Sequence, residues 1–201
     1  GASSFNQDLR SWRVGNVANM TDMFAEAAAF DQDLGWCVDA GLDLDGAFDN
    51  TLCAWQDCGV HSKCFMTDSN IRAAVAAWVS DAAAAEATYG HMSSWETSAV
   101  TDMANLFCER EAWMEGDTDF DACVLPRNDP GIPREPIGDW DTSSVTTMHR
   151  MFRNSPVFNQ PIGSWRVDKV TDMSGMFGET SMFNQPLNAW DVSEVEKMYG
   201  M

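Results

Sequence analysis

The sequence is poor in basic residues and has no long hydrophobic run. Only 12 of its 201 residues are Lys or Arg, against 31 Asp or Glu, and the formal net charge is −19 at pH 7. Binding to nucleic acid or to an anionic membrane surface requires clustered Lys and Arg, so neither is an expected partner. The richest apolar stretch, residues 71–87, is mostly Ala and is interrupted by Ser80 and Asp81. This segment is therefore expected to contain no membrane span.

Motifs of known catalytic and metal sites are also missing. The sequence has no Gly-x-Ser-x-Gly elbow, Walker loop, dinucleotide fingerprint or His-Glu-x-x-His helix. No residues in the sequence therefore support a hydrolase, and we expect a protein without catalytic residues. The absence of Cys-x-x-Cys pairs argues against a zinc ribbon or a thioredoxin-type site.

The six cysteines form an even set and lie where the sequence departs from its repeat: Cys37, Cys53, Cys58, Cys64, Cys108 and Cys123. Disulfides that hold irregular loops together fit this placement and indicate an oxidising compartment. Free buried thiols are the alternative. We expect Cys108 to pair with Cys123 at the base of an insertion, while the other pairings stay open.

A repeat of about 25 residues runs through the chain. Its most regular position is a tryptophan, which we use as the origin of each unit: Trp12, Trp95, Trp140, Trp165 and Trp190. Each of these is followed by Val after five residues and by Met after eight. A degraded copy contains Trp36, one residue early. The predicted core includes, besides the tryptophans, Val145, Met148, Phe152, Val170, Met173 and Phe177.

One such unit buries too little apolar surface to offset the entropy of ordering its backbone, so the units must stack. We expect a short strand at each Trp and a short helical or 3₁₀ turn over the Val-x-x-Met-x-x-Met-Phe segment. Because Leu or Ile three residues before Trp has the wrong parity for that strand, a bend or a bulge must intervene. Asn-Gln pairs such as Asn159-Gln160 should form amide ladders between units.

The segment FNQPIGSWRVDKVTDMSGMF, residues 158–177, resembles the repeat of BspA-like surface proteins, which are related to leucine-rich repeats. The resemblance covers residues 1–36 and 92–201. It implies an α/β solenoid: a right-handed stack with one short parallel strand per coil. It also implies display at the cell surface, in adhesion or protein interaction.

The repeat is interrupted between residues 37 and 94. Residues 68–88 have the apolar spacing of a helix, with Tyr89-Gly90 as its stop and Ser80-Asp81 as a point where it can break into two pieces. We interpret this helix as the cap of a second array. The predicted organisation is the end of a first array (1–52), a Cys-rich junction (53–66), and a helical cap (67–90) with a second array to residue 201. One continuous solenoid with a long bulge is the alternative.

A second interruption, residues 108–134, inserts a loop into the second array. Insertions in solenoids often bind partners, so Trp113 and Phe120 are candidate contact residues. A decorated loop without function is the alternative.

An Asp-rich stretch at residues 41–52 aligns poorly with a calcium-binding EF-hand loop, because its first and last ligand positions are Gly41 and Leu52. A looser calcium site would use Asp39, Asp43, Asp45 and Asp49. A solvated Asp-rich linker is the simpler interpretation, so we expect no cofactor apart from this calcium candidate.

These features predict a non-enzymatic extracellular or cell-surface module whose partners are other proteins. The alternative is a building block of a filament, sheath or larger assembly in which arrays pack end to end, so that the partners are chains of the same assembly.

Overall fold

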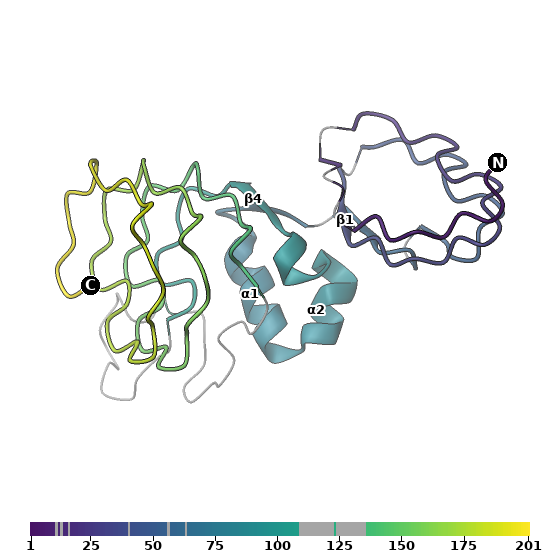
Figure 1. Cartoon of the computed structure of the whole chain (residues 1–201). Helices are drawn as coiled ribbons and strands as arrows, with labels where there is room; N and C mark the ends of the chain where they lie inside the picture. The colour runs from purple at the N-terminus through teal and green to yellow at the C-terminus, as the bar shows by residue number, and fades with distance from the viewer. Residues whose placement is uncertain are drawn as a thin grey trace. The chain divides into compact units, whose positions relative to one another are not determined.

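The computed structural model describes residues 1–10, 12, 14–15, 17–39, 41–55, 57–62, 64–108, 123 and 136–201. The chain forms two compact units (Figure 1). Unit 1 comprises Gly1–Phe65 and Glu86–Trp95, and unit 2 comprises Met66–Ala85 and Glu96–Met201. The 3₁₀ helix η1 (Met92–Ser94) belongs to unit 1.

Regular secondary structure is short. In unit 1, β1 (Trp36–Cys37) pairs in parallel with β2 (Val60–His61). The second two-stranded sheet joins β3 (Phe65–Thr67) and β4 (Glu96–Ala99).

The two helices follow one another around residue 81. Helix α1 (Ile71–Ser80) lies in unit 2, whereas α2 (Ala82–Tyr89) spans the division between the units. Asp81 separates them in an extended conformation, so the predicted break of the helix at Ser80-Asp81 is confirmed. Gly90, with φ +71°, follows the end of α2.

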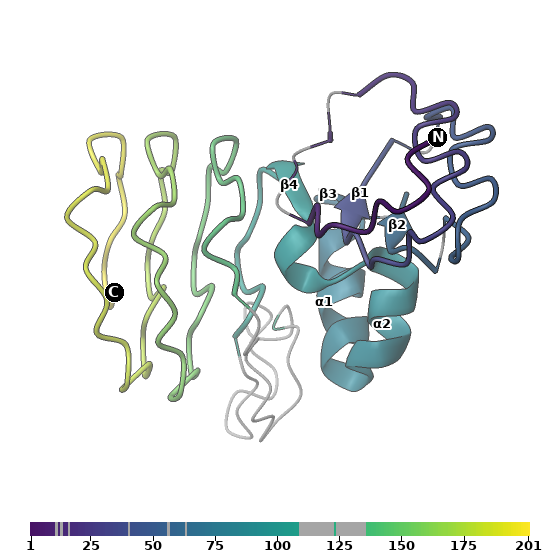
Figure 2. The same cartoon turned by 45° about the vertical axis from the view of Figure 1, so that its right-hand side comes forward.

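The repeats of unit 2 lie on one another as coils (Figure 2). Single parallel bridges join neighbouring coils at the position seven residues after Trp: Asp102 to Thr147, Thr147 to Asp172, and Asp172 to Lys197. We expected the strand at Trp itself, and in the coil of Trp95 it begins one residue later, as β4. In the Trp140, Trp165 and Trp190 coils the bridge lies seven residues later instead. In these coils the backbone N–H of Trp donates a hydrogen bond to the carbonyl three residues earlier, as Trp165 does to Ile162 at 3.1 Å. That turn is the expected bend.

Hydrogen bonds between coils involve every second backbone N–H. Met148 donates to the carbonyl of Asp172, Arg150 to Ser174 and Phe152 to Met176, each at 2.9 Å. The same ladder in unit 1 joins Met20 to Asp43 and Asp22 to Asp45, each at 3.0 Å.

The expected helical turn after Val is wrong for the described coils. Residues at two positions per coil have positive φ, ten and fourteen residues after Trp: Asp22, Gly46, Asn105, Arg150, Gly175 and Gly200, and then Glu26, Asn50, Asn154 and Glu179. A left-handed residue ends a right-handed helical run. The segment therefore forms turns, which leave alternate N–H groups free to bond the next coil.

The interior of unit 2 consists of columns of like residues. Val145, Met148, Phe152, Val170 and Met173 are fully buried. The Phe152 ring stacks on its repeat equivalents, at 5.6 Å from Phe107 and 5.9 Å from Phe177 between ring centroids, and Phe158 fills the gap at 3.9 Å from Phe152. Phe177, nearer the last coil, is half-buried.

The tryptophans connect neighbouring coils as well as filling the core. The indole Nε1 of Trp165 donates to the carbonyl of Ile137 at 3.0 Å, and that of Trp190 donates to Ile162 at 3.2 Å. In unit 1, Trp36 donates to Leu9 at 3.1 Å. Each acceptor carbonyl lies three residues before the Trp of the preceding coil, so the indole also sets the register.

The predicted amide ladder is present between the last two coils. Asn159 Oδ1 accepts from the backbone N–H of Asn184 at 2.9 Å and from Gln185 Nε2 at 3.0 Å. In unit 1, Asn6 Oδ1 accepts in the same way from Asp31 N–H and Gln32 Nε2.

Residues 36–39 and 41–50 form the coil of the degraded copy that contains Trp36. Asp43 and Asp45 accept from the coil of Trp12, and Gly46 and Asn50 occupy the two left-handed positions. Phe48 packs on Phe24, with centroids 5.4 Å apart. The copy is degraded because Gly, Leu and Ala replace Val, Met and Met at its core positions.

The residues around α1 close the first coil face of unit 2. The Asp68 carboxylate accepts from Thr101 N–H at 2.8 Å, Thr101 Oγ1 at 2.6 Å and Asp102 N–H at 3.0 Å. In the following coils, the N–H equivalent to Thr101 donates to the preceding coil instead, as Thr146 does to Thr101 at 2.8 Å. Arg72 donates to the carbonyl of Ala104 at 2.7 Å and pairs with Asp102 at 3.1 Å. Asp68 thus supplies the acceptor that a preceding coil would provide.

We expect Asp68→Asn to lower the free energy of unfolding by about 0.5–1.5 kcal/mol at neutral pH, because the side chain is exposed and solvent screens its charge. Burial alone raises the pKa of Asp68. The hydrogen bonds from Thr101 and Asp102, together with Arg72, nevertheless hold the pKa below its ordinary value. A carboxyl with a lowered pKa in the folded state stabilises it above the unfolded pKa of about 3.9, and this contribution is lost as pH falls through the folded pKa.

Denaturant unfolding between pH 7 and pH 3 measures this effect. The difference between wild type and Asp68→Asn should be largest at pH 7 and shrink in the acid range. Asp139→Asn, at an exposed position of the same unit, is the charge-matched control. A difference that does not depend on pH would contradict the role of the carboxylate.

Candidate interaction site

All six cysteines are paired. The disulfides join Cys37 to Cys64, Cys53 to Cys58 and Cys108 to Cys123. The predicted Cys108–Cys123 pair is confirmed, and Cys37–Cys64 connects β1 with the chain just before β3. Three disulfides are compatible with an extracellular or secreted protein.

The four aspartates proposed for calcium are not brought together as a site. Among the residues that the structure describes, no group of three or more His, Cys, Asp or Glu is placed to hold a metal ion. Asp39 Oδ1 instead accepts from Gly41 N–H at 2.7 Å, and Asp43 Oδ1 accepts from Asp45 N–H at 3.0 Å. Asp102 and Asp172 make the equivalent short-range bond in unit 2. The Asp-rich stretch is a repeat coil whose carboxylates close turns.

We therefore expect calcium to leave the thermal midpoint of the protein unchanged. Melting curves in about 5 mM calcium, which exceeds the dissociation constant of a weak extracellular site, and in excess chelator measure this midpoint. Magnesium is the control for a general ionic effect. A rise in the thermal midpoint that is specific to calcium would contradict the role of these aspartates in closing turns.

The histidines have structural contacts. His91 Nδ1 lies 2.7 Å from Ser93 Oγ, and the ring also accepts from Ser93 N–H at the start of η1. This contact resembles a nucleophile–base pair, but the His91 side chain serves as the cap of η1. His149 Nδ1 lies 3.7 Å from Asp172 Oδ1, and Lys197 Nζ lies 3.4 Å from the other carboxylate oxygen, Asp172 Oδ2. These contacts lie along the bridges between coils.

The candidate partner residues Trp113 and Phe120 lie outside the described residues. The site that the structure offers is elsewhere, on the coil of Trp12 in unit 1.

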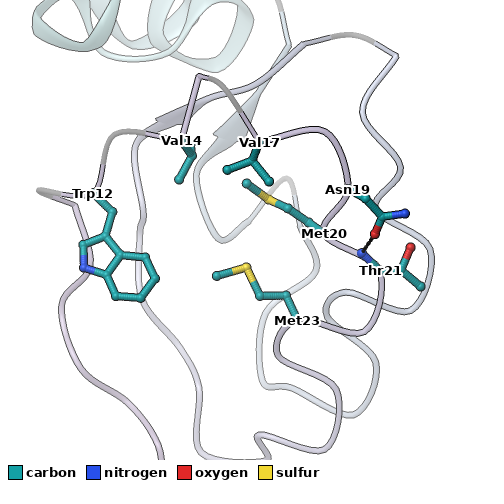
Figure 3. A pocket seen from close by; sticks show the side chains of 7 residues that line it. All are labelled: Trp12, Val14, Val17, Asn19, Met20, Thr21 and Met23. Carbon is teal, nitrogen blue, oxygen red and sulfur yellow. Dashed lines mark hydrogen bonds between the residues drawn. The ribbon is translucent and has the colours of Figure 1, made fainter.

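A cavity of about 630 Å³ opens on the Trp12 coil (Figure 3). Its lining is mostly apolar: Trp12, Val14, Val17, Asn19, Met20, Thr21 and Met23. In Figure 3 the Trp12, Val17 and Met23 side chains converge on one space. The Asn19 side chain is engaged in the turn, since Asn19 Oδ1 accepts from Thr21 N–H at 2.8 Å.

These apolar residues are exposed although their repeat equivalents are core. Trp12 is 53% exposed and Val17 39%, whereas Trp165 is 3% and Val170 0% exposed. The inner side of Trp12 stacks on Trp36, with ring centroids 6.2 Å apart. We call the outer side, formed by Trp12, Val17 and Met23, the Trp12 face.

The Trp12 face also presents polar backbone and indole groups that are bonded in other coils. Trp12 Nε1 and the carbonyls of Asn19 and Thr21 form no hydrogen bond within the described residues. Their equivalents in the Trp36 coil all bond the Trp12 coil. Apolar surface beside unused donors and acceptors in ladder register is suited to binding another polypeptide.

Sequence reasoning placed Trp12 in the buried core with the other tryptophans. No residue of this unit sets Trp12 apart, because Val17, Met20 and Met23-Phe24 follow it as their equivalents follow the buried tryptophans.

A protein-family model, described as "Mycoplasma protein of unknown function, DUF285", matches residues 1–60, 77–122 and 128–201. The chain belongs to this family. The DUF285 match includes the coils of both units and leaves out residues 61–76, where unit 1 gives way to unit 2, and residues 123–127. No curated protein and no solved structure matches the chain. In the described part of this DUF285 chain, no helix is both long and apolar enough to cross a membrane.

Proposed function

We propose that both units are leucine-rich-repeat-like right-handed solenoids of the BspA-like kind. The support is the ladder that repeats every 25 residues through Thr147, Asp172 and Lys197, and the columns of like side chains beneath it. Asp68, Arg72 and α1 act as the cap of the second solenoid.

We propose further that the chain is a non-enzymatic extracellular or cell-surface module that binds other proteins. The observation that carries this proposal is the Trp12 face, where Trp12 and Val17 lie open in a cavity although the same positions are core elsewhere. Such a face binds by covering apolar area and completing a backbone ladder. This chemistry selects a polypeptide partner.

Photo-cross-linking on intact cells tests this function. A photoreactive amino acid in place of Val17 should give protein adducts, because Val17 lies on the Trp12 face. The same residue in place of Val157, which is 56% exposed in unit 2, is the matched control and should give at least about tenfold less, the ratio expected for 1.4 kcal/mol of binding energy. Equal yields at both positions would contradict a specific face, and adducts formed instead at Trp113 or Phe120 would favour the insertion loop.

The extracellular assignment predicts that cysteine pairing survives in the protein taken from its native cells. Peptide mapping under alkylating, non-reducing conditions should recover all three pairs, Cys37–Cys64, Cys53–Cys58 and Cys108–Cys123. Two or more alkylated thiols per chain would contradict this compartment, because a reducing cytosol keeps cysteines free.

The alternative function is a building block whose repeat arrays pack end to end, because neighbouring coils of this kind join through a backbone ladder. The identity of the cross-linked partner separates the two functions.

A further inference from the structure

A sequence motif for N-glycosylation lies on the Trp12 coil of unit 1. Residues 19–21 are Asn-Met-Thr. An Asn followed two residues later by Ser or Thr, with any residue except Pro between them, is the acceptor motif for an N-linked glycan. No other Asn of the sequence is followed in this way. Because so short a motif also occurs by chance, its structural context has to decide its meaning.

We propose that Asn19 carries an N-linked glycan in the mature protein. This inference rests on the proposed function in one respect, the extracellular or cell-surface location, because N-glycosylation is a modification of secreted and surface-displayed chains. It does not depend on what the Trp12 face binds or on what packs against it.

The transfer is a nucleophilic substitution at a sugar carbon. The amide nitrogen of Asn19, Nδ2, forms a bond to the anomeric carbon of an oligosaccharide that is activated as a glycosyl diphosphate lipid. The bond between that carbon and the diphosphate oxygen breaks, and its electron pair leaves with the lipid diphosphate. Nδ2 loses one proton to a base of the transferase, and nothing is oxidised or reduced. The acceptor therefore needs an Asn amide nitrogen that no other bond engages, with a hydroxyl side chain two residues later.

The side chains of the motif meet this requirement. Asn19 and Thr21 are exposed, whereas Met20 between them is buried, as the alternation of an extended segment requires. Asn19 Oδ1 accepts from Thr21 N–H at 2.8 Å, and Nδ2 makes no hydrogen bond in the described part of the chain. Figure 3 shows Nδ2 directed away from the Trp12 and Met23 side chains. The turn thus holds the oxygen of the amide and presents its nitrogen to solvent.

The accessibility of Asn19 follows from its place at the side of the stack and not from the end of the array. Asn19 occupies the bridge position, seven residues after Trp, and pairs with Asp43. Asp102 and Asp172 occupy the same position with bonded neighbours on both sides, yet their side chains are 48% and 21% exposed. A coil packed before that of Trp12 would leave the Asn19 side chain accessible in the same way.

Turn closure does not explain why this residue is Asn. The Asp43 and Asp172 carboxylates close the same turn, each accepting the N–H two residues later. Among the described residues that form single bridges between coils, Asn19 is the one with an amide side chain. An amide adds to the turn only the Nδ2 group, which is the acceptor of the glycan.

A glycan at this position leaves the backbone ladder intact. The ladder bonds beside the motif run from Met20 N–H to the carbonyl of Asp43 and from Asp22 N–H to that of Asp45, each at 3.0 Å. None of these groups belongs to the Asn19 side chain. The bulky, solvated sugar would project from the side of the coil.

Mass spectrometry of the protein isolated from its native cells tests the proposal. Alkylation without reduction followed by proteolysis gives the peptide that contains Asn19. Peptide N-glycosidase in heavy-oxygen water converts a glycosylated Asn to labelled Asp, and a sample kept in the same water without the enzyme controls for spontaneous deamidation. The Asn19 peptide should carry a hexosamine-containing glycan before treatment and the label at position 19 after it.

Two variants expressed in the same cells separate glycan transfer from turn formation. Thr21→Ala removes the hydroxyl of the motif and should abolish the modification, whereas Thr21→Ser retains the hydroxyl and should keep it. Both variants keep the backbone N–H that bonds Asn19 Oδ1, and circular dichroism checks that both are folded. A glycan that persists at Asn19 in Thr21→Ala would overturn the proposal, as would a sugar on the Thr21 hydroxyl that resists the glycosidase.

The same digest also reports the pairing of the cysteines, which tests the compartment independently. An unmodified Asn19 in a chain whose three disulfides are intact would overturn this inference and leave the extracellular function standing. An unmodified Asn19 together with two or more alkylated thiols would remove both proposals.

Discussion

Hydrogen bonding between neighbouring coils is the constraint on which this structure depends. Within one coil the chain makes turns, and left-handed residues such as Arg150 and Gly175 leave alternate N–H groups without a local partner. Those groups are satisfied by the next coil, and the Trp indole adds one bond of the same direction. A coil is therefore complete only when it has a neighbour on each side. Columns such as Phe107, Phe152 and Phe177 follow from that register.

The ends of a ladder are where this constraint becomes functional. Asp68 shows how a ladder is closed: one carboxylate accepts the N–H groups that a preceding coil would otherwise bind, and Arg72 saturates a carbonyl beside it. The Trp12 face has no such group in the described part of the chain. It combines exposed apolar side chains with a cavity, which suits it to a polypeptide partner.

Acidic composition has a local explanation in this fold. Aspartates at the bridge position, Asp43, Asp102 and Asp172, each accept the N–H two residues later and so fix the turn that precedes a left-handed residue. The Asp-rich stretch that suggested a cation site is one of these turns in a degraded coil. A high density of carboxylates is thus consistent with turn formation and solubility and does not by itself indicate metal chemistry.

The sequence by itself determined the repeat, its period and the amide ladder, because like residues at a fixed spacing have one common explanation, a stack. It also indicated the helix break at Asp81 and the Cys108–Cys123 pair, since both depend on local chain properties. Tertiary structure decided where the bridges lie, because the left-handed conformations of Asp22 or Arg150 are not encoded by residue type as clearly as those of glycine. It also decided the pairing of the remaining cysteines and the exposure of Trp12. A side chain that is buried in one coil is open in another for one reason: burial in a stack is provided by the neighbouring layer and not by the residue's own sequence.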